Sequence, residues 1–175
     1  MLLRIVTAAA FLSVLGGGAI AGVELVDSDF QVTFQYGGVE QRLSETTVPM
    51  LPSNVCYTWW LKLSEGAAPG SAIERLVLPE PPASWGDAAT DDGMYILEDG
   101  KLALSRFYPE IDSDGWISKG WCAAAGDPIG SHRIEVLLDG VMAKAFDFEV
   151  VRPEDYPWPA LRQPDPRERS VQNSW

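Results

Sequence analysis

The sequence has little of what catalytic sites most often require. It has one histidine and two cysteines in 175 residues. It has no Gly-x-Ser-x-Gly elbow, no glycine-rich phosphate loop and no His-rich metal pattern. The lone His132 is predicted to share a strand face with Ile134 and Val136, where a structural histidine is favoured over a general base. The sequence therefore predicts a protein that is not an enzyme, although paired carboxylates for glycoside hydrolysis stay an open alternative because acids are abundant.

Basic residues are scarce and scattered. There are 13 Lys and Arg against 25 Asp and Glu, and the net charge is −12. A strongly acidic chain without a Lys/Arg cluster is repelled by phosphate backbones and by anionic lipid. The sequence therefore predicts no nucleic-acid partner.

The one long apolar run is at the N-terminus. Arg4 follows the start, residues 5–15 are apolar, and three glycines at 16–18 lead to Ala19 and Ala21, which have the spacing of a cleavage site. An uncleaved membrane anchor is the alternative, since the run nearly reaches the length of a span. The glycines and the cleavage site favour a signal peptide over residues 1–21. We therefore expect a periplasmic or secreted protein with no membrane insertion after cleavage.

The expected compartment indicates the state of the two cysteines, Cys56 and Cys122. An even pair of cysteines in an oxidising compartment is usually a disulfide. No second soft ligand lies near either residue in the sequence, which disfavours a zinc site. We therefore predict a Cys56–Cys122 bond.

No segment after the apolar N-terminus has a helical period over ten or more residues. Apolar and polar residues alternate instead, in short segments separated by Gly and Pro. Tyr57, Trp59, Leu61 and Leu63, for example, share the face expected to point into the core. The pattern predicts an all-β, immunoglobulin-like antiparallel sandwich of about seven to eight strands over residues 22–151. The segments expected to be extended are 23–34, 39–48, 56–63, 73–78, 94–97, 101–108, 116–123, 132–138 and 141–151.

The last two segments form the clearest hairpin, around Asp139 and Gly140. A plain two-residue turn would place Phe146 on the polar face. We therefore predict a three-residue loop at 138–140, with Gly140 left-handed in a bulge and Ile134 paired with Lys144.

Residues 152–175 lose all alternation and contain five prolines. Their composition predicts an extended, mostly disordered tail. In the alternative interpretation, Tyr156 and Trp158 dock on the domain.

Three stretches carry a family resemblance. They are residues 35–37 (Gln-Tyr-Gly), residues 47–49 leading into 56–59, and residues 129–136 followed by the Asp139 turn. Over residues 23–151 the chain resembles a small family of bacterial exported immunoglobulin-like domains of unknown function. The resemblance implies the sandwich fold and supplies no catalytic or binding residues.

Glu110, Asp112 and Asp114 stand at alternate positions before Gly115, as acids do in a calcium loop. However, the motif starts with Glu, and its twelfth position is Trp121 in place of a bidentate acid. A solvated turn is therefore the favoured interpretation, a calcium site is the alternative, and no other cofactor is expected.

Seven tryptophans are the remaining unusual feature. The favoured interpretation is that these side chains pack across the disulfide or beneath the tail, and the hypothesis set against it is that Trp60, Trp85 and Trp116 form an exposed aromatic patch. The sequence thus predicts a non-catalytic binding or accessory module that contacts a protein partner through a sheet face or loops. The alternative is a carbohydrate-binding module that uses exposed tryptophans, with a structural calcium as a further option.

Overall fold

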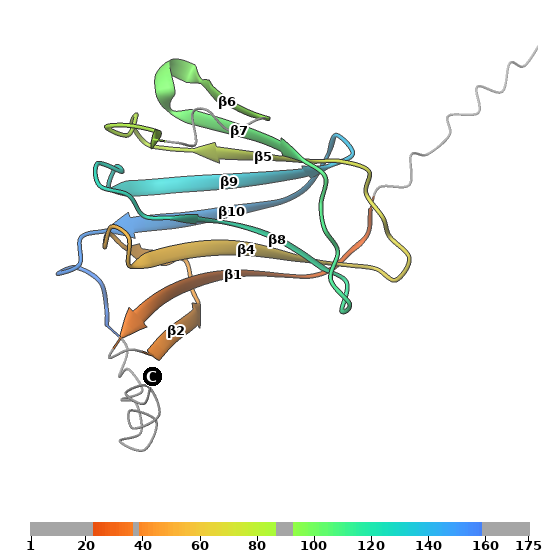
Figure 1. Ribbon diagram of the computed structural model, residues 1–175, viewed down its shortest axis with the longest axis horizontal. Helices are drawn as coiled ribbons and strands as arrows, with labels where there is room; N and C mark the ends of the chain where they lie inside the picture. Colours follow the sequence, from red (N-terminus) through yellow and green to blue (C-terminus); the bar gives the residue numbers. More distant parts are fainter. Residues whose placement is uncertain (1–22, 37–38, 87–92, 159–175) are drawn as a thin grey trace, which may run out of the picture.

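The computed structural model describes residues 23–36, 39–86 and 93–158, which form two stacked β-sheets (Figure 1). The predicted signal peptide, residues 1–21, lies outside this part of the chain. Within the described residues, no helix has the length and apolar character needed to cross a membrane.

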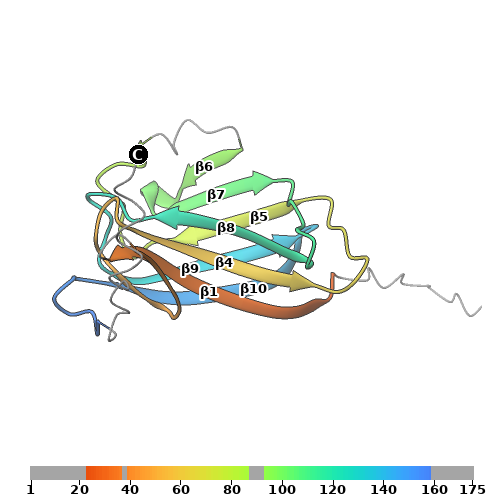
Figure 2. The same cartoon turned by 60° about the horizontal axis from the view of Figure 1, so that its bottom comes forward.

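One sheet has four strands and the other has six. Figure 2 shows the two layers from a second direction. The four-stranded sheet has the order β2-β1-β4-β8, with β1 Leu25–Tyr36, β2 Val39–Ser44, β4 Val55–Leu63 and β8 Trp116–Cys122. The six-stranded sheet has the order β3-β10-β9-β5-β7-β6, with β3 Thr47–Pro49, β5 Ala72–Val77, β6 Met94–Leu97, β7 Leu102–Phe107, β9 Gly130–Leu138 and β10 Val141–Val151. The pairings are antiparallel except that β3 runs parallel to β10. A short 3₁₀ turn, η2 Glu98–Gly100, joins β6 to β7.

The topology is that of an immunoglobulin-like sandwich, which confirms the predicted fold class. Strands β1, β4 and β8 share one sheet, while β5, β9 and β10 share the other, as the A, B, E and the C, F, G strands of such domains do. Strands β7 and β6 extend the second sheet beyond β5. The described residues form ten strands, more than the seven to eight predicted.

One additional strand arises where the predicted segment 39–48 divides into β2 and β3. The amide of Glu45 still donates to the carbonyl of Phe30 in the four-stranded sheet, at 3.1 Å. One residue later, the carbonyl of Thr46 accepts from the amide of Glu149 in the six-stranded sheet, at 2.8 Å. The chain therefore changes sheets between two adjacent residues.

Strand β4 supplies the centre of the core. Its alternate residues are buried, and they include the four that the sequence pattern placed inside: Tyr57, Trp59, Leu61 and Leu63. Tyr57 packs against Phe148 of the opposite sheet, with ring centroids 4.9 Å apart. Burial of this apolar area stabilises the fold by roughly 25 cal/mol per Å². The same alternation turns the intervening side chains of β4 to the outer face.

The β9–β10 hairpin corrects the predicted loop. Asp139 (φ 48°) and Gly140 (φ 80°) are both left-handed and form a two-residue turn, and the pairing shifts between Met142 and Lys144. The left-handed Gly140 and the presence of a bulge were predicted correctly. The three-residue loop was wrong, because the extra residue is Ala143, inside β10.

This bulge resolves the conflict in the sequence pattern without lengthening the turn. It pairs Phe146 with Ile134, in place of the predicted Lys144–Ile134 pair, and it turns Phe146 into the core. The tight turn is held from outside, because the Asp139 carboxylate accepts from the amide of Ser71 at 2.9 Å.

The first residues of the predicted disordered tail pack on the sandwich, which corrects that prediction for residues 152–158. Tyr156 is buried, and its hydroxyl donates to the carboxylate of Glu45. Trp158 meets Phe34 edge to face at 5.7 Å. These two aromatic contacts attach the segment to the sandwich. Residues 159–175 lie outside the described residues.

Candidate functional site

Cys56 and Cys122 form the predicted disulfide. They sit directly opposite each other on β4 and β8, with Cα atoms 3.8 Å apart. Both belong to the four-stranded sheet, and they lie on its outer face, since the alternate residues Tyr57 and Ala123 point inward. In antibody domains the disulfide joins the two sheets through the core. Here it ties two neighbouring strands at the surface.

Two of the three predicted patch tryptophans lie together on that outer face. The rings of Trp60 in β4 and Trp116 in β8 are 6.4 Å apart and nearly perpendicular, at 84°. Both side chains are half-buried. The ammonium of Lys62 lies 5.6 Å from the centre of the Trp116 ring. The pair therefore forms the aromatic centre of this sheet face.

Trp85 does not belong to this pair. It lies on the loop after β5, where its indole N–H donates to the carbonyl of Gly100 at 3.0 Å. Its ring packs against Trp121, 6.2 Å away, on the inner side of the sandwich. The predicted single patch is thus two separate aromatic pairs. Trp85 occupies a loop without sequence periodicity, so no pattern could place it.

Two hollows flank the Trp60–Trp116 pair. The larger hollow has a volume of about 630 Å³. Besides the two tryptophans, its lining includes Phe107, Tyr108, Glu110, Ile111, Asp112 and Lys119. The smaller, about 260 Å³, adds Asp29, Gln31 and Arg42. Tyr108 is 85% exposed and Ile111 is 39% exposed. We call Trp60, Trp116, Tyr108 and Ile111 the tryptophan face, which charged and polar side chains border on both sides.

Two of the three candidate calcium ligands, Asp112 and Asp114, lie in a turn at the edge of this face, and Glu110 precedes that turn. One carboxylate oxygen of Asp112 accepts from the amides of Asp114 and Trp116, each at 2.9 Å. The amide of Gly115 donates back to the carbonyl of Asp112 at 3.1 Å. Within the described ranges, no group of three His, Cys, Asp or Glu side chains is close enough to hold a metal ion. The Asp112 carboxylate instead fixes the point at which Trp116 enters β8.

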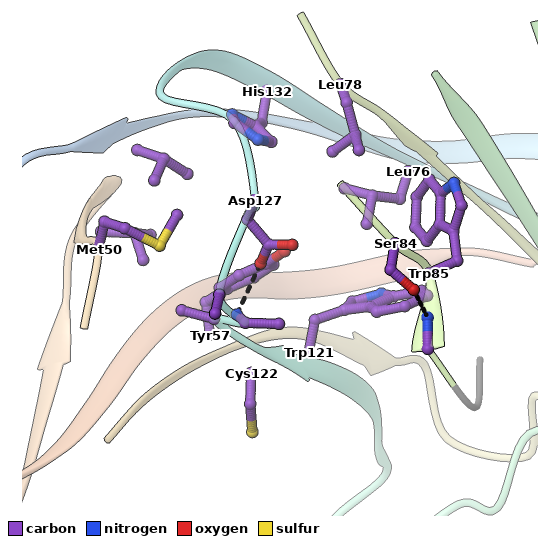
Figure 3. Close-up of a pocket in the computed structure, with 16 residues that line it drawn as sticks. Met50, Tyr57, Leu76, Leu78, Ser84, Trp85, Trp121, Cys122, Asp127 and His132 are labelled. Carbon is purple, nitrogen blue, oxygen red and sulfur yellow. Dashed lines mark hydrogen bonds between the residues drawn. The ribbon is translucent and has the colours of Figure 1, made fainter. Parts of the chain in front are cut away.

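A pocket of about 380 Å³ opens between the two sheets, at the end where β4 begins and β8 ends (Figure 3). Both sheets and the loops around Trp85 and Asp127 contribute to its wall. The side chains around it are mostly apolar or aromatic: Val48, Met50, Tyr57, Leu76, Leu78, Trp85, Trp121 and Val150. Ser84, Asp127 and His132 add polar side chains, beside the hydroxyl of Tyr57.

His132 is buried at this pocket, on the predicted inward face of β9. Its Nδ1 lies 2.8 Å from the carbonyl oxygen of Gly130, so Nδ1 carries the proton and donates. Burial lowers the pKa of His132 from its ordinary 6.5, which keeps the ring neutral at pH 7. Its face packs on Phe148 at 5.2 Å. The ring is thus a neutral part of the wall.

Glu74 is the residue that sequence reasoning missed. It lies on β5, fully buried, and accepts hydrogen bonds from the indole N–H groups of Trp59 and of Trp121, the second at 2.9 Å. The ammonium of Lys119 is 3.8 Å from its carboxylate. Burial raises the pKa of Glu74, and it outweighs the opposing effects of Lys119 and the two indoles. One sequence signal pointed inward: Glu74 alternates with Leu76 and Leu78.

Glu74 therefore joins the two sheets and holds Trp121 against the pocket. Glu74 also affects the phenol of Tyr57. Burial first, then the charges of Asp127 and Glu74, raise the pKa of Tyr57 well above its ordinary value. Tyr57 is therefore a neutral hydroxyl in the pocket wall.

These features define the chain as an immunoglobulin-like β-sandwich domain with a surface aromatic face and an end pocket. A family model, the PM0630 beta sandwich domain, matches residues 28–151. The chain belongs to this family, which confirms the predicted family resemblance. No match was found among curated proteins.

Solved structures that are similar to the chain include the following two. An immunoglobulin-like protein (PA1606) from Pseudomonas aeruginosa is 12% identical, with a TM-score of 0.47, and the match covers 75% of this chain and 99% of that one. The alkylpurine DNA glycosylase AlkC from Pseudomonas fluorescens, bound to DNA containing an abasic site analog, is 15% identical with a TM-score of 0.37. That match covers 78% of this chain and 32% of the glycosylase.

Proposed function

We propose that the chain is an exported, non-catalytic binding module that contacts a protein partner through the tryptophan face. The observation that carries this proposal is the Trp60–Trp116 pair at the centre of a sheet face, beside the exposed Tyr108 and Ile111. Protein interfaces combine a central cluster of Trp and Tyr with a polar, charged rim. Here the rim comprises Asp29, Gln31, Arg42, Glu110 and Lys119.

The ring geometry favours a protein over a glycan. Sugar rings stack flat on an open aromatic face. Trp60 and Trp116 stand at 84° to each other, and Lys62 lies against the Trp116 ring. A perpendicular pair suits side chains that approach from several directions.

Two features support export and the absence of catalysis. Residues 1–21 have the pattern of a signal peptide, and the Cys56–Cys122 bond suits an oxidising compartment. Glu74, a fully buried carboxylate, is enclosed by two indoles, so it is unsuited to contact a substrate. We therefore assign the protein a periplasmic or secreted binding role.

Site-specific photo-crosslinking in the native host tests the tryptophan face. A photo-reactive phenylalanine analogue at Tyr108 is expected to give one defined adduct with a partner protein, which mass spectrometry then identifies. The same probe at Tyr95, which is 55% exposed on β6 of the other sheet, is the matched control and should not give that adduct. Adding Trp60→Ala should reduce the Tyr108 adduct at least tenfold, because central aromatic side chains carry most interface energy.

Two results would contradict the proposal. One is the absence of a defined adduct at Tyr108, or the same adduct at both positions. The other is binding of the purified protein to a glycan array that disappears with Trp60→Ala, which would establish the carbohydrate-binding alternative. Circular dichroism of the Trp60→Ala variant checks that the fold is intact.

A further inference from the structure

The pocket between the sheets is separate from the tryptophan face and has the walls of a built site. Small-molecule sites are concave and mostly apolar, of ~300–1,000 Å³, with a few convergent polar groups. This pocket has about 380 Å³ and two indoles, Trp85 and Trp121, in its wall (Figure 3).

Hydrogen bonds fix the walls in place. Trp121 donates to the buried Glu74, and Trp85 donates to the carbonyl of Gly100. The two loops that border the opening are also joined, because the amide of Ala83 donates to the carbonyl of Gly126 at 2.9 Å. A ligand would therefore meet aromatic surfaces that are already oriented, which reduces the entropy lost on binding.

Asp127 gives the pocket its charge. It is half-buried in the turn between β8 and β9, and one carboxylate oxygen accepts from the amide of Ala124 at 2.8 Å. Lysine and arginine are both missing from the described side chains that line the pocket, and His132 is kept neutral by burial. The buried Glu74 lies behind the Trp121 wall. The pocket is therefore apolar with a single negative group.

We propose that this pocket binds a small amphipathic cation, an apolar or aromatic molecule that carries one protonated amine. The ammonium group pairs with Asp127, and the apolar body packs between Trp85, Trp121 and Met50. Aromatic side chains attract a cation over their faces, and the effect grows as water is excluded. The net charge of −12 adds a field that draws cations and repels anions.

Three indole ligands that differ in one group test the proposal. Tryptamine carries an amine, tryptophol a neutral hydroxyl and indole-3-acetate a carboxylate. Each is titrated into the full chain, and the NMR signals of the Trp85 and Trp121 indole N–H groups report binding. Tryptamine is expected to bind at least tenfold more tightly than tryptophol, and indole-3-acetate more weakly than both.

Asp127→Asn should abolish the preference for the amine while it leaves tryptophol binding unchanged. The asparagine oxygen still accepts from Ala124, so the turn is preserved. Asp155→Asn is the matched control, since it removes one exposed acid outside the pocket lining and should keep the preference. Three results would each overturn the proposal. Tryptamine and tryptophol could bind equally, or tryptamine could fail to bind at about 10 mM ligand. The third result is an unchanged preference for the amine in Asp127→Asn. None of these results depends on the partner of the tryptophan face.

Discussion

Replacing Glu74 with alanine is expected to lower the free energy of unfolding by about 3–5 kcal/mol at pH 7. The substitution leaves the buried indole N–H groups of Trp59 and Trp121 without their acceptor, at roughly 1–3 kcal/mol each. It also opens a cavity between the sheets. Urea denaturation followed by tryptophan fluorescence measures the loss.

Glu74→Gln is the matched control and should cost less, because its amide oxygen still accepts from one indole. The pair also gives a pH test. Burial raises the folded-state pKa of Glu74 above its ordinary 4.5, so the native state binds the proton more readily than the unfolded chain. The part of the Glu74 contribution that depends on protonation is fully present below pH 4.5 and is lost as the pH rises through the folded-state pKa. The stability of the wild type relative to Glu74→Gln should therefore increase as the pH falls from 7 toward 4.5.

A loss below ~1 kcal/mol for Glu74→Ala would mean that water or a rearranged side chain satisfies the two indoles. The opposite pH slope would mean that Lys119 and the indole donors outweigh burial.

Replacing both Cys56 and Cys122 with serine is expected to lower the free energy of unfolding by roughly 4 kcal/mol. The bond closes a loop between residues 66 positions apart, and its removal restores conformational freedom to the unfolded chain. Both side chains lie on the outer face, so the serines create no cavity and bury no new hydroxyl in the core. The loss therefore reports the cross-link itself.

Reduction of the wild type by dithiothreitol is the control. Its unfolding free energy should fall to nearly that of the double-serine variant, and the wild-type value should return on reoxidation. If reduced and oxidised protein unfold at the same urea concentration, the cross-link contributes nothing beyond the pairing of β4 with β8. A large difference between the reduced wild type and the serine variant would indicate that the substitutions disturb the native sheet.

The strands were predictable wherever one face is buried. In β4, Tyr57, Trp59 and Leu61 alternate with polar or outward residues, and a period of two has no other simple explanation. The same logic placed His132 inward on β9 and Trp60 outward on β4. The disulfide followed from the expected compartment, because two cysteines allow one pairing.

The burial of Glu74 and the position of the bulge in the last hairpin could not be predicted, because they depend on contacts between distant parts of the chain. Glu74 has the polarity of a surface residue, and its indole partner Trp121 is 47 positions away, so the pattern of β5 alone could not reveal the pair. The Phe146 pattern showed that the last hairpin needs an extra residue. It did not show that Ala143 takes that place, because the tight turn is held by contacts of Asp139 with Ser71.

The surface bond between Cys56 and Cys122 also determines how the domain responds to a pulling force. A bond between the sheets would lock β4 to the opposite layer, whereas this bond makes β4, β5, β6, β7 and β8 parts of one closed loop. When the chain is stretched from its two ends, the force passes through the Cys56–Cys122 bond, and the residues between the two cysteines carry none of it. Only β1, β2 and β3 on one side and β9 and β10 on the other can be drawn out. The residues inside the closed loop have a contour length on the order of 220 Å, at ~3.3–3.6 Å per residue. This length is added to the stretched chain only after the bond is reduced.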